Sequence, residues 1–329
     1  VLFADASGVR PAALRSDLGT YVRLLGVGLP LTLGLGLVLA VVLLDMDGWT
    51  ALLLGAALAP TDAALGSAVV SDPAVPSRIR RVLNVESGLN DGIVTPVVLL
   101  AISEVAAQEG IGGVEEPGRA LVSLVAGVAV GVLLGGAGGW LTRLARDRGW
   151  LSEDWAGTAV LALALLAYSG AVLVDANGFV AAFVGGLAFG ATAGRQREQE
   201  VSFVEQSGRL ASLMSWLVFG ALLLPVLVDQ VDWRVVLYAV LSLTVVRMLP
   251  VALSLVGTGL DRSSVAFIGW FGPRGLASVI FALLALEGLH AAVHQAVATI
   301  AVTVLLSVVA HGASAAPLAK RYGRSHDSR

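Results

Sequence analysis

The chain has 329 residues, of which 57% are hydrophobic and 14% are charged, with a mean hydropathy of +0.85 and a formal net charge of −3. So apolar a composition excludes an ordinary soluble globular protein and predicts a membrane protein with several spans. The absence of cysteine excludes disulfides and thiolate-bound metals, and the four histidines show no zinc-ligand spacing.

Apolar windows of about 20 residues, bounded by charged or Gly- and Pro-rich turns, predict ten membrane spans. In chain order these are 24–44, 49–70, 82–105, 120–141, 155–174, 179–193, 210–228, 235–256, 265–286 and 291–318, followed by a C-terminal tail at 319–329. Val1 to Phe3 have the composition of a last helical turn. We therefore expect further helices to precede the first residue.

The basic residues test this topology independently, because short cytoplasmic loops are rich in Lys and Arg. Of the 21 basic residues, 17 fall on one side of the predicted membrane. Arg119 and Arg234 fall on the other side, and Arg247 and Arg274 lie inside spans. This asymmetry predicts a multi-pass protein of the cell membrane with both termini in the cytoplasm.

Two predicted spans are interrupted. The second contains Pro60, Thr61 and Asp62, and the ninth contains Gly-Pro-Arg-Gly at 272–275. Pro removes an amide donor and Gly permits non-helical backbone, which at membrane depth is tolerated only inside protein or beside a polar cavity. The two spans run in opposite directions, which is typical of an inverted repeat with discontinuous helices near a transport site. Pairing the repeats predicts 13 helices in the intact protein, of which about ten are present here.

The third span has one polar face, formed by Glu86, Ser87, Asn90 and Asp91 within an arc of about 140°. Carboxylate, hydroxyl and carbonyl oxygens are the hard ligands that suit a small alkali cation. We therefore predict a Na⁺ site at Asp62, Ser87 and Asp91. The main-chain oxygen of Thr61, freed by the interruption, is a further predicted ligand.

The same oxygens can hold a proton or a cation, because desolvation favours a protonated carboxyl and a bound cation favours the ionised form. Mutually exclusive occupancy predicts antiport of Na⁺, or alternatively K⁺ or Li⁺, against H⁺ by alternating access, for pH and cation homeostasis. Since Asn90 rather than a second acid lies beside Asp91, we expect electroneutral exchange of one proton per cation. No cofactor is expected besides the transported ions, and no nucleotide or nucleic-acid motif is present.

The two arginines inside spans need partners, because an unpaired guanidinium is prohibitively costly in the membrane. Glu86 is the spare acid, and we assign it to Arg247 as a structural pair. Arg274 is then expected to face the carbonyl ends of the half-helices. His311, in the last span, is interpreted as a core histidine with hydrogen-bond partners rather than as a pH sensor.

Four motifs follow one another along the chain, namely PTDAAL at 60–65, VESGLNDG at 85–92, VVRMLP at 245–250 and GPRGLAS at 272–278. On these residues the chain resembles the sodium/proton exchanger family, the first family of monovalent cation:proton antiporters. The resemblance implies one exchanger domain over 1–329, with an all-α inverted-repeat fold in which two discontinuous helices cross. It implies core ion-binding elements at 49–105 and 235–286, and a dimerisation domain that makes the protein a homodimer in the lipid bilayer.

The resemblance also implies individual roles. Asp91 is then the acid that binds the cation and carries the proton, with Asp62, Ser87 and the Thr61 carbonyl as further ligands. Glu86 is salt-bridged to Arg247, and Asn90 supports that pair.

Two other classes of function stay open from the residues. An intramembrane aspartyl protease also uses two buried acids on neighbouring helices, although it needs neither basic residues in spans nor broken helices. An uncoupled cation channel is usually a symmetric ring of short repeats, rather than one pair of inverted elements. We therefore expect a secondary transporter and not an enzyme.

Overall fold

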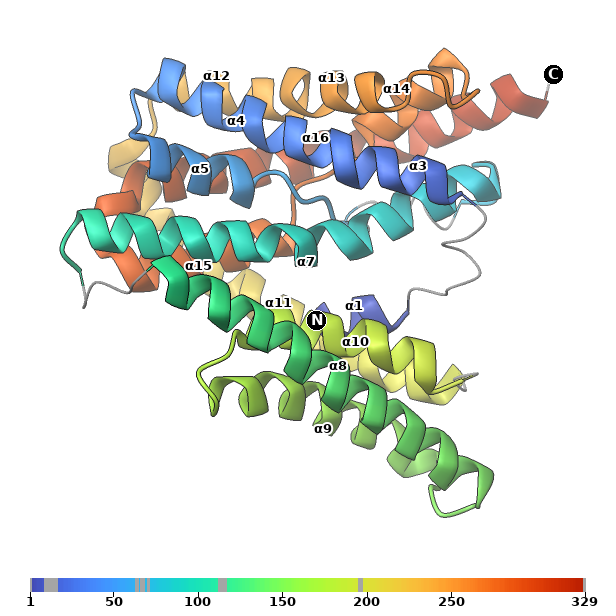
Figure 1. The fold of residues 1–329 in the computed structure, drawn as a ribbon. Coiled ribbons are helices and arrows are strands. Elements are labelled where there is room, and N and C mark those ends of the chain that lie inside the picture. Colours follow the sequence, from blue (N-terminus) through green and yellow to red (C-terminus); the bar gives the residue numbers. More distant parts are fainter. Residues whose placement is uncertain are drawn as a thin grey trace. The chain divides into compact units, whose positions relative to one another are not determined.

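The computed structural model describes residues 2–8, 17–62, 65, 69, 72–111, 117–194 and 198–327. Within these ranges all regular structure is helical and no strand occurs, which confirms the all-α fold class (Figure 1). Six helical stretches of the described part are long and apolar enough to cross a membrane, namely Leu18–Leu44, Ser77–Gln108, Leu121–Asp147, Trp155–Val172, Trp233–Ser254 and Leu276–Arg324. Two shorter apolar helices are α5 (Gly48–Ala57) and α10 (Gly178–Thr192).

The helices form two compact units. Unit 1 consists of Val1–Ser16 and Val114–Met214, and unit 2 consists of Asp17–Gly113 and Ser215–Arg329. Both stretches that the sequence predicts to bind ions, 49–105 and 235–286, belong to unit 2.

Unit 1 contains α1 (Leu2–Ser7), α8 (Pro117–Asp147), α9 (Glu153–Val172), α10 and the first part of α11 (Glu198–Gln230). Glycines bring α8 and α10 very close together. A Cβ atom on Gly135 would lie 2.0 Å from the carbonyl oxygen of Gly185, and one on Gly139 would lie 2.2 Å from Thr192 Oγ1. Gly136, in contrast, faces open space. Such close van der Waals packing favours helix association within a bilayer, where no hydrophobic force acts between helices.

Unit 2 contains the rest of α11 and all the other helices. Before unit 1's long insertion come α3 (Leu18–Arg23), the π-helical turn η1 (Leu24–Gly28), α4 (Leu29–Leu44), α5 and α7 (Ser77–Gln108). After it come α12 (Trp233–Leu243), α13 (Val245–Ser254), α14 (Arg262–Trp270), α15 (Leu276–Leu289), the 3₁₀ turn η2 (His290–Val293) and α16 (His294–Asp327). Asp47 starts α5, because its carboxylate accepts hydrogen bonds from the amides of Trp49 and Thr50. The predicted tail at 319–329 continues α16 as far as Asp327.

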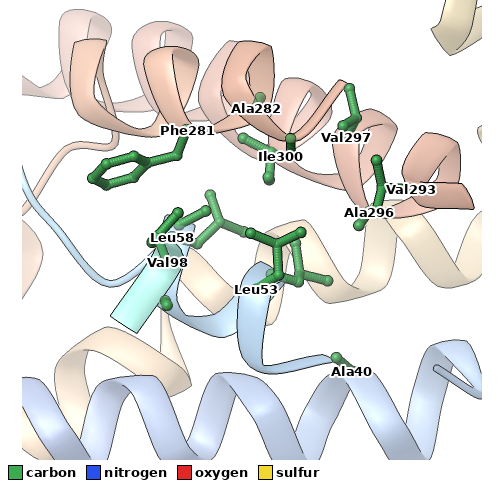
Figure 2. Close-up of a cluster of buried hydrophobic side chains, with 14 of the residues drawn as sticks. Ala40, Leu53, Leu58, Val98, Phe281, Ala282, Val293, Ala296, Val297 and Ile300 are labelled. Carbon is green, nitrogen blue, oxygen red and sulfur yellow. The ribbon is translucent and has the colours of Figure 1, made fainter. Parts of the chain in front are cut away.

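A buried apolar core joins the helices of unit 2. Figure 2 shows Leu53 of α5 and Leu58, just after it, beside side chains of α7, α15 and α16, among them Val98, Phe281 and Ile300. Leu53, Val98 and Ile300 are completely buried. The core therefore fixes the two half-helices α5 and α15 next to the points where their spans are interrupted.

Both predicted interruptions are present. The ninth predicted span is divided into α14 and α15, with the non-helical residues 271–275 between them. In the second span α5 ends at Ala57, and residues 58–62 leave the helical path around Pro60. The rest of that span, 63–70, lies outside the described residues except for Leu65 and Val69.

Candidate ion-binding site

Thr61 joins the non-helical segment after α5 to the polar face of α7. Its main-chain oxygen accepts a hydrogen bond of 2.6 Å from Ser87 Oγ, and its hydroxyl accepts one of 2.8 Å from Asn90 Nδ2. All three residues are buried. Because Ser87 and Asn90 lie three residues apart on one side of the helix, α7 holds this segment at two points.

Asp62 connects the two interrupted spans. Its amide donates to the carbonyl oxygen of Pro273 at 2.8 Å, and its Oδ2 accepts from the amide of Leu276, the first residue of α15, at 3.0 Å. The preceding residue, Gly275, has no side chain to cap this helix. Asp62 therefore caps α15 from another segment, where free amides and the positive end of the helix dipole favour a carboxylate. These bonds place the two non-helical segments in direct contact.

This capping role of Asp62 was absent from the sequence prediction, which treated the residue only as a ligand. One signal for it exists in the motif GPRGLAS. Here α15 begins directly after Gly275, without a Ser, Thr, Asp or Asn at the cap position. A helix that starts without its own cap inside a membrane requires a cap from elsewhere in the fold.

Glu86 and Arg247 form the predicted ion pair. The two guanidinium nitrogens Nη1 and Nη2 of Arg247 donate to Oε1 and Oε2 of Glu86 at 2.6 and 3.0 Å. Both residues are 3% exposed, and the paired geometry is the strong bidentate one. Asn90, which the family resemblance places in support of this pair, donates instead to Thr61.

Arg274 is completely buried and faces main-chain oxygens, as predicted. Its Nη1 donates to the carbonyl oxygens of Pro60 and Ala59 at 3.1 and 3.2 Å, just beyond the end of α5. The hydroxyl of Ser278 donates to the carbonyl oxygen of Ala57, the last residue of α5, at 2.6 Å. A positive charge at this place stabilises the negative end of the α5 dipole.

Asp91 lies on α7 four residues after Ser87 and is half-buried. Its main-chain oxygen accepts a hydrogen bond from Thr95 Oγ1 at 2.7 Å, within the same helix. The helical spacing directs its side chain to the side of α7 that carries Ser87. Among the described residues no group of three or more His, Asp or Glu side chains is placed to hold a metal ion. Hydroxyl and carbonyl oxygens are also suitable ligands for a hard cation.

Comparison with known proteins gives consistent results. The family model described as "Sodium/hydrogen exchanger, transmembrane" matches residues 1–321. The K(+)/H(+) antiporter NhaP2 of Shewanella oneidensis is 28% identical over 286 residues, which are 86% of this chain and 49% of that protein. The Na(+)/H(+) antiporter 2 of Zygosaccharomyces rouxii is 30% identical over 254 residues, which are 70% of this chain and 30% of that protein.

Among solved structures, the sodium proton antiporter MjNhaP1 from Methanocaldococcus jannaschii superposes with a TM-score of 0.80 at 20% identity. The match covers 98% of this chain and 83% of that one, and it supports the same fold. The chain spans about half the length of the bacterial relatives it matches.

Proposed function

The chain belongs to the sodium/hydrogen exchanger family, and from this premise we propose that it is a secondary antiporter that exchanges a monovalent cation for a proton. The observation that supports the proposal most directly is the junction at Asp62, where both interrupted spans meet beside the polar face of α7. The proposed cation ligands are Asp62, Ser87, Asp91 and the carbonyl oxygen of Thr61, and the proposed proton carrier is Asp91.

The hydrogen bonds at this junction suit a cation. Ser87 donates its only hydroxyl proton to the main-chain oxygen of Thr61, so its Oγ can meet a positive ion only through its lone pairs. The Thr61 oxygen accepts this bond with one of its two lone pairs and keeps the other. A cation that binds between these oxygens and Asp91 favours the ionised carboxylate and so releases the proton.

The charges of the candidate site support an exchange of one ion for one proton. The carboxylates of Asp62, Glu86 and Asp91 carry three negative charges, and the guanidiniums of Arg247 and Arg274 carry two positive ones. One monovalent cation or one proton neutralises the remaining charge, and a second positive charge would be unfavourable in a site of low dielectric. We therefore propose electroneutral exchange by alternating access.

Na⁺ is the proposed cation, with K⁺ and Li⁺ as alternatives, since relatives are named for either sodium or potassium. The test uses the chain reconstituted into liposomes that contain a quenched pH-sensitive dye. We expect addition of at least one alkali cation to release protons and restore the fluorescence, whereas choline has no effect. Rates that do not change when the membrane potential is clamped would support the one-to-one stoichiometry. Failure of all three alkali cations to move protons would contradict the proposed function.

The close contact between Gly275 and Asp62 gives a sharper prediction. A Cβ atom on Gly275 would lie 2.0 Å from Asp62 Oδ2, so Gly275→Ala must displace that carboxylate. We expect the rate of exchange to fall by about 100-fold, since a shift of about 1 Å in a positioned group can have an effect of this size. The matched control is Gly269→Ala on α14, where the nearest atom would be at an ordinary 3.5 Å. Equal rates for the two variants would contradict the role of Asp62.

We also propose the setting in which the protein acts. The protein spans the cell membrane with its C-terminus in the cytoplasm, acts as a homodimer and serves pH and cation homeostasis. The exposed apolar side chains of α8 and α9, such as Leu121, Leu133 and Leu165, support contact with lipid in unit 1. The uneven distribution of Lys and Arg supports the orientation. The family resemblance supports the homodimer.

A further inference from the structure

The interruption at 271–275 leaves main-chain groups on both of its sides without helical partners, and α16 supplies partners for them. The carbonyl oxygen of Trp270, at the end of α14, lies 2.9 Å from His311 Nε2. The amide of Arg274, on the other side of the break, donates to Ser307 Oγ at 2.7 Å. Ser307 and His311 are themselves adjacent, with 3.1 Å between Ser307 Oγ and His311 Nδ1.

These contacts form one chain of hydrogen bonds, and the main-chain groups at its two ends fix the direction of the outer bonds. A carbonyl oxygen can only accept, so His311 Nε2 donates to Trp270. An amide can only donate, so Ser307 Oγ accepts from Arg274, and its own proton can be donated to His311 Nδ1. Every donor thus has an acceptor when the imidazole carries a single proton, on Nε2.

A second ring proton would disrupt this chain. The main-chain oxygen of Ser307 lies 2.9 Å from His311 Nδ1 and would accept that proton, but the Ser307 hydroxyl would then lose its acceptor. In the described part of the chain, the charged groups that interact electrostatically with His311 are the guanidiniums of Arg274 and Arg247, and neither can act as a counter-ion to an imidazolium. The hydrogen-bond pattern therefore fits the neutral histidine.

The residues that form these hydrogen bonds are buried, so loss of one bond would leave a polar group without a partner. Ser307 is 0% exposed, His311 is 2% exposed and Arg274 is 0% exposed, so water does not compete for the same groups. Their spacing of four residues places Ser307 and His311 on one face of α16. One turn further, Ser314 Oγ accepts a hydrogen bond of 3.0 Å from the indole of Trp270. The same face of α16 thus holds Trp270 through both its main chain and its side chain.

The connection continues to the candidate ion site. Arg274, whose amide Ser307 holds, directs its guanidinium to the carbonyl oxygens of Ala59 and Pro60. Those two residues immediately precede Thr61, and Asp62 follows it. We propose that Ser307 and His311 are positioning residues for exchange, which fix both sides of the break and thereby the segment that carries the ion ligands. This inference rests on the proposed antiport.

The test compares substitutions of His311 in the reconstituted full chain. His311→Leu keeps the volume but loses both polar partners, and we expect the KM for the alkali cation to rise about tenfold, as follows from leaving a buried group unsatisfied. His311→Gln retains an N–H donor for Trp270, and its KM should return to within about threefold of the original value. The pH profile of His311→Gln should match that of the unsubstituted chain, because the inference gives His311 a single ring proton, so that neither side chain carries a charge. A shifted profile, or an unchanged KM in His311→Leu, would overturn the inference.

Thr303→Val is the matched control on α16. Thr303 is also 0% exposed, but its hydroxyl donates only within its own helix, to Thr299 at 2.7 Å. We expect its KM and pH profile to stay unchanged. If Thr303→Val raised the KM as much as His311→Leu, the effect of His311→Leu would be due to general packing of α16, and the inference would be overturned.

Hydrogen exchange separates this inference from the proposed function. Ser307→Ala removes the acceptor of the Arg274 amide, so peptides that cover 271–278 should exchange at least about tenfold faster than in the unsubstituted chain. This measurement requires no transport. Unchanged exchange of these amides would refute the positioning role even in a chain that transports, whereas a chain that fails to transport any cation would refute only the antiport.

Discussion

Replacement of Asp91 by Asn is expected to reduce cation-driven proton release to the level of liposomes without protein. The amide has nearly the same shape as the carboxyl group, but it neither carries a titratable proton nor presents a negative oxygen to a cation. With Asn at this position the charges of Asp62 and Glu86 balance those of Arg247 and Arg274, so nothing in the cluster requires an added positive ion. The measurement is dye dequenching after pulses of Na⁺, K⁺ and Li⁺ at several pH values.

Asp175→Asn is the matched control for this substitution. Asp175 is an exposed acid of unit 1 with a φ of 56°, a left-handed conformation that Asn tolerates well. We expect full exchange from this variant. If Asp91→Asn exchanged ions as fast as Asp175→Asn, the assignment of Asp91 as proton carrier would be wrong.

Loss of either partner of the ion pair between Glu86 and Arg247 is expected to lower the free energy of unfolding by about 3 to 5 kcal/mol. Glu86→Leu leaves a guanidinium, and Arg247→Met leaves a carboxylate, without a counter-charge at positions that are 3% exposed. The double variant removes both charges and should recover most of the lost stability, because apolar groups of similar volume can replace a buried pair. Thermal unfolding of the purified variants in detergent measures the three effects.

An exposed ion pair provides the control for these unfolding measurements. Arg234 and Asp45 are 2.7 Å apart, but their side chains are 44% and 77% exposed. Asp45→Asn should therefore change the free energy of unfolding by less than about 1 kcal/mol. Additive losses in the Glu86 and Arg247 double variant would contradict a direct interaction between these two residues.

The apolar helices, the interruptions and the pairing of charges could be predicted from the sequence for a common reason. Each follows from the cost of placing a polar group in lipid. Pro60 and Pro273 must disturb a helix because they lack an amide proton, and Glu86 was the acid left over for a buried arginine. Such rules depend on residue type and local spacing, which a sequence displays directly.

The remaining features depend on which distant segments meet in space. The cap that Asp62 gives to α15 joins residues more than 200 positions apart in the sequence, and the contacts of His311 with Trp270 depend on the rotation of α16. The break between α12 and α13 falls at Thr244, whose φ and ψ of −109° and −87° are not helical, although neither Pro nor Gly occupies that position. The first two depend on long-range packing, which no local pattern of residues shows, and nothing in the local sequence explains the break at Thr244.

Each of the two interrupted spans supplies the charged side chain that stabilises a helix end of the other. The acid beyond α5 covers the amide end of α15, while the arginine before α15 covers the carbonyl end of α5. If the two spans separated, the N-terminal amides of α15 and the C-terminal carbonyls of α5 would both lose their charged partners inside the membrane. Neither span carries a residue that could replace the lost partner. We therefore expect them to move as a single rigid piece during the proposed antiport, together with the ion ligands that Thr61 and Asp62 supply.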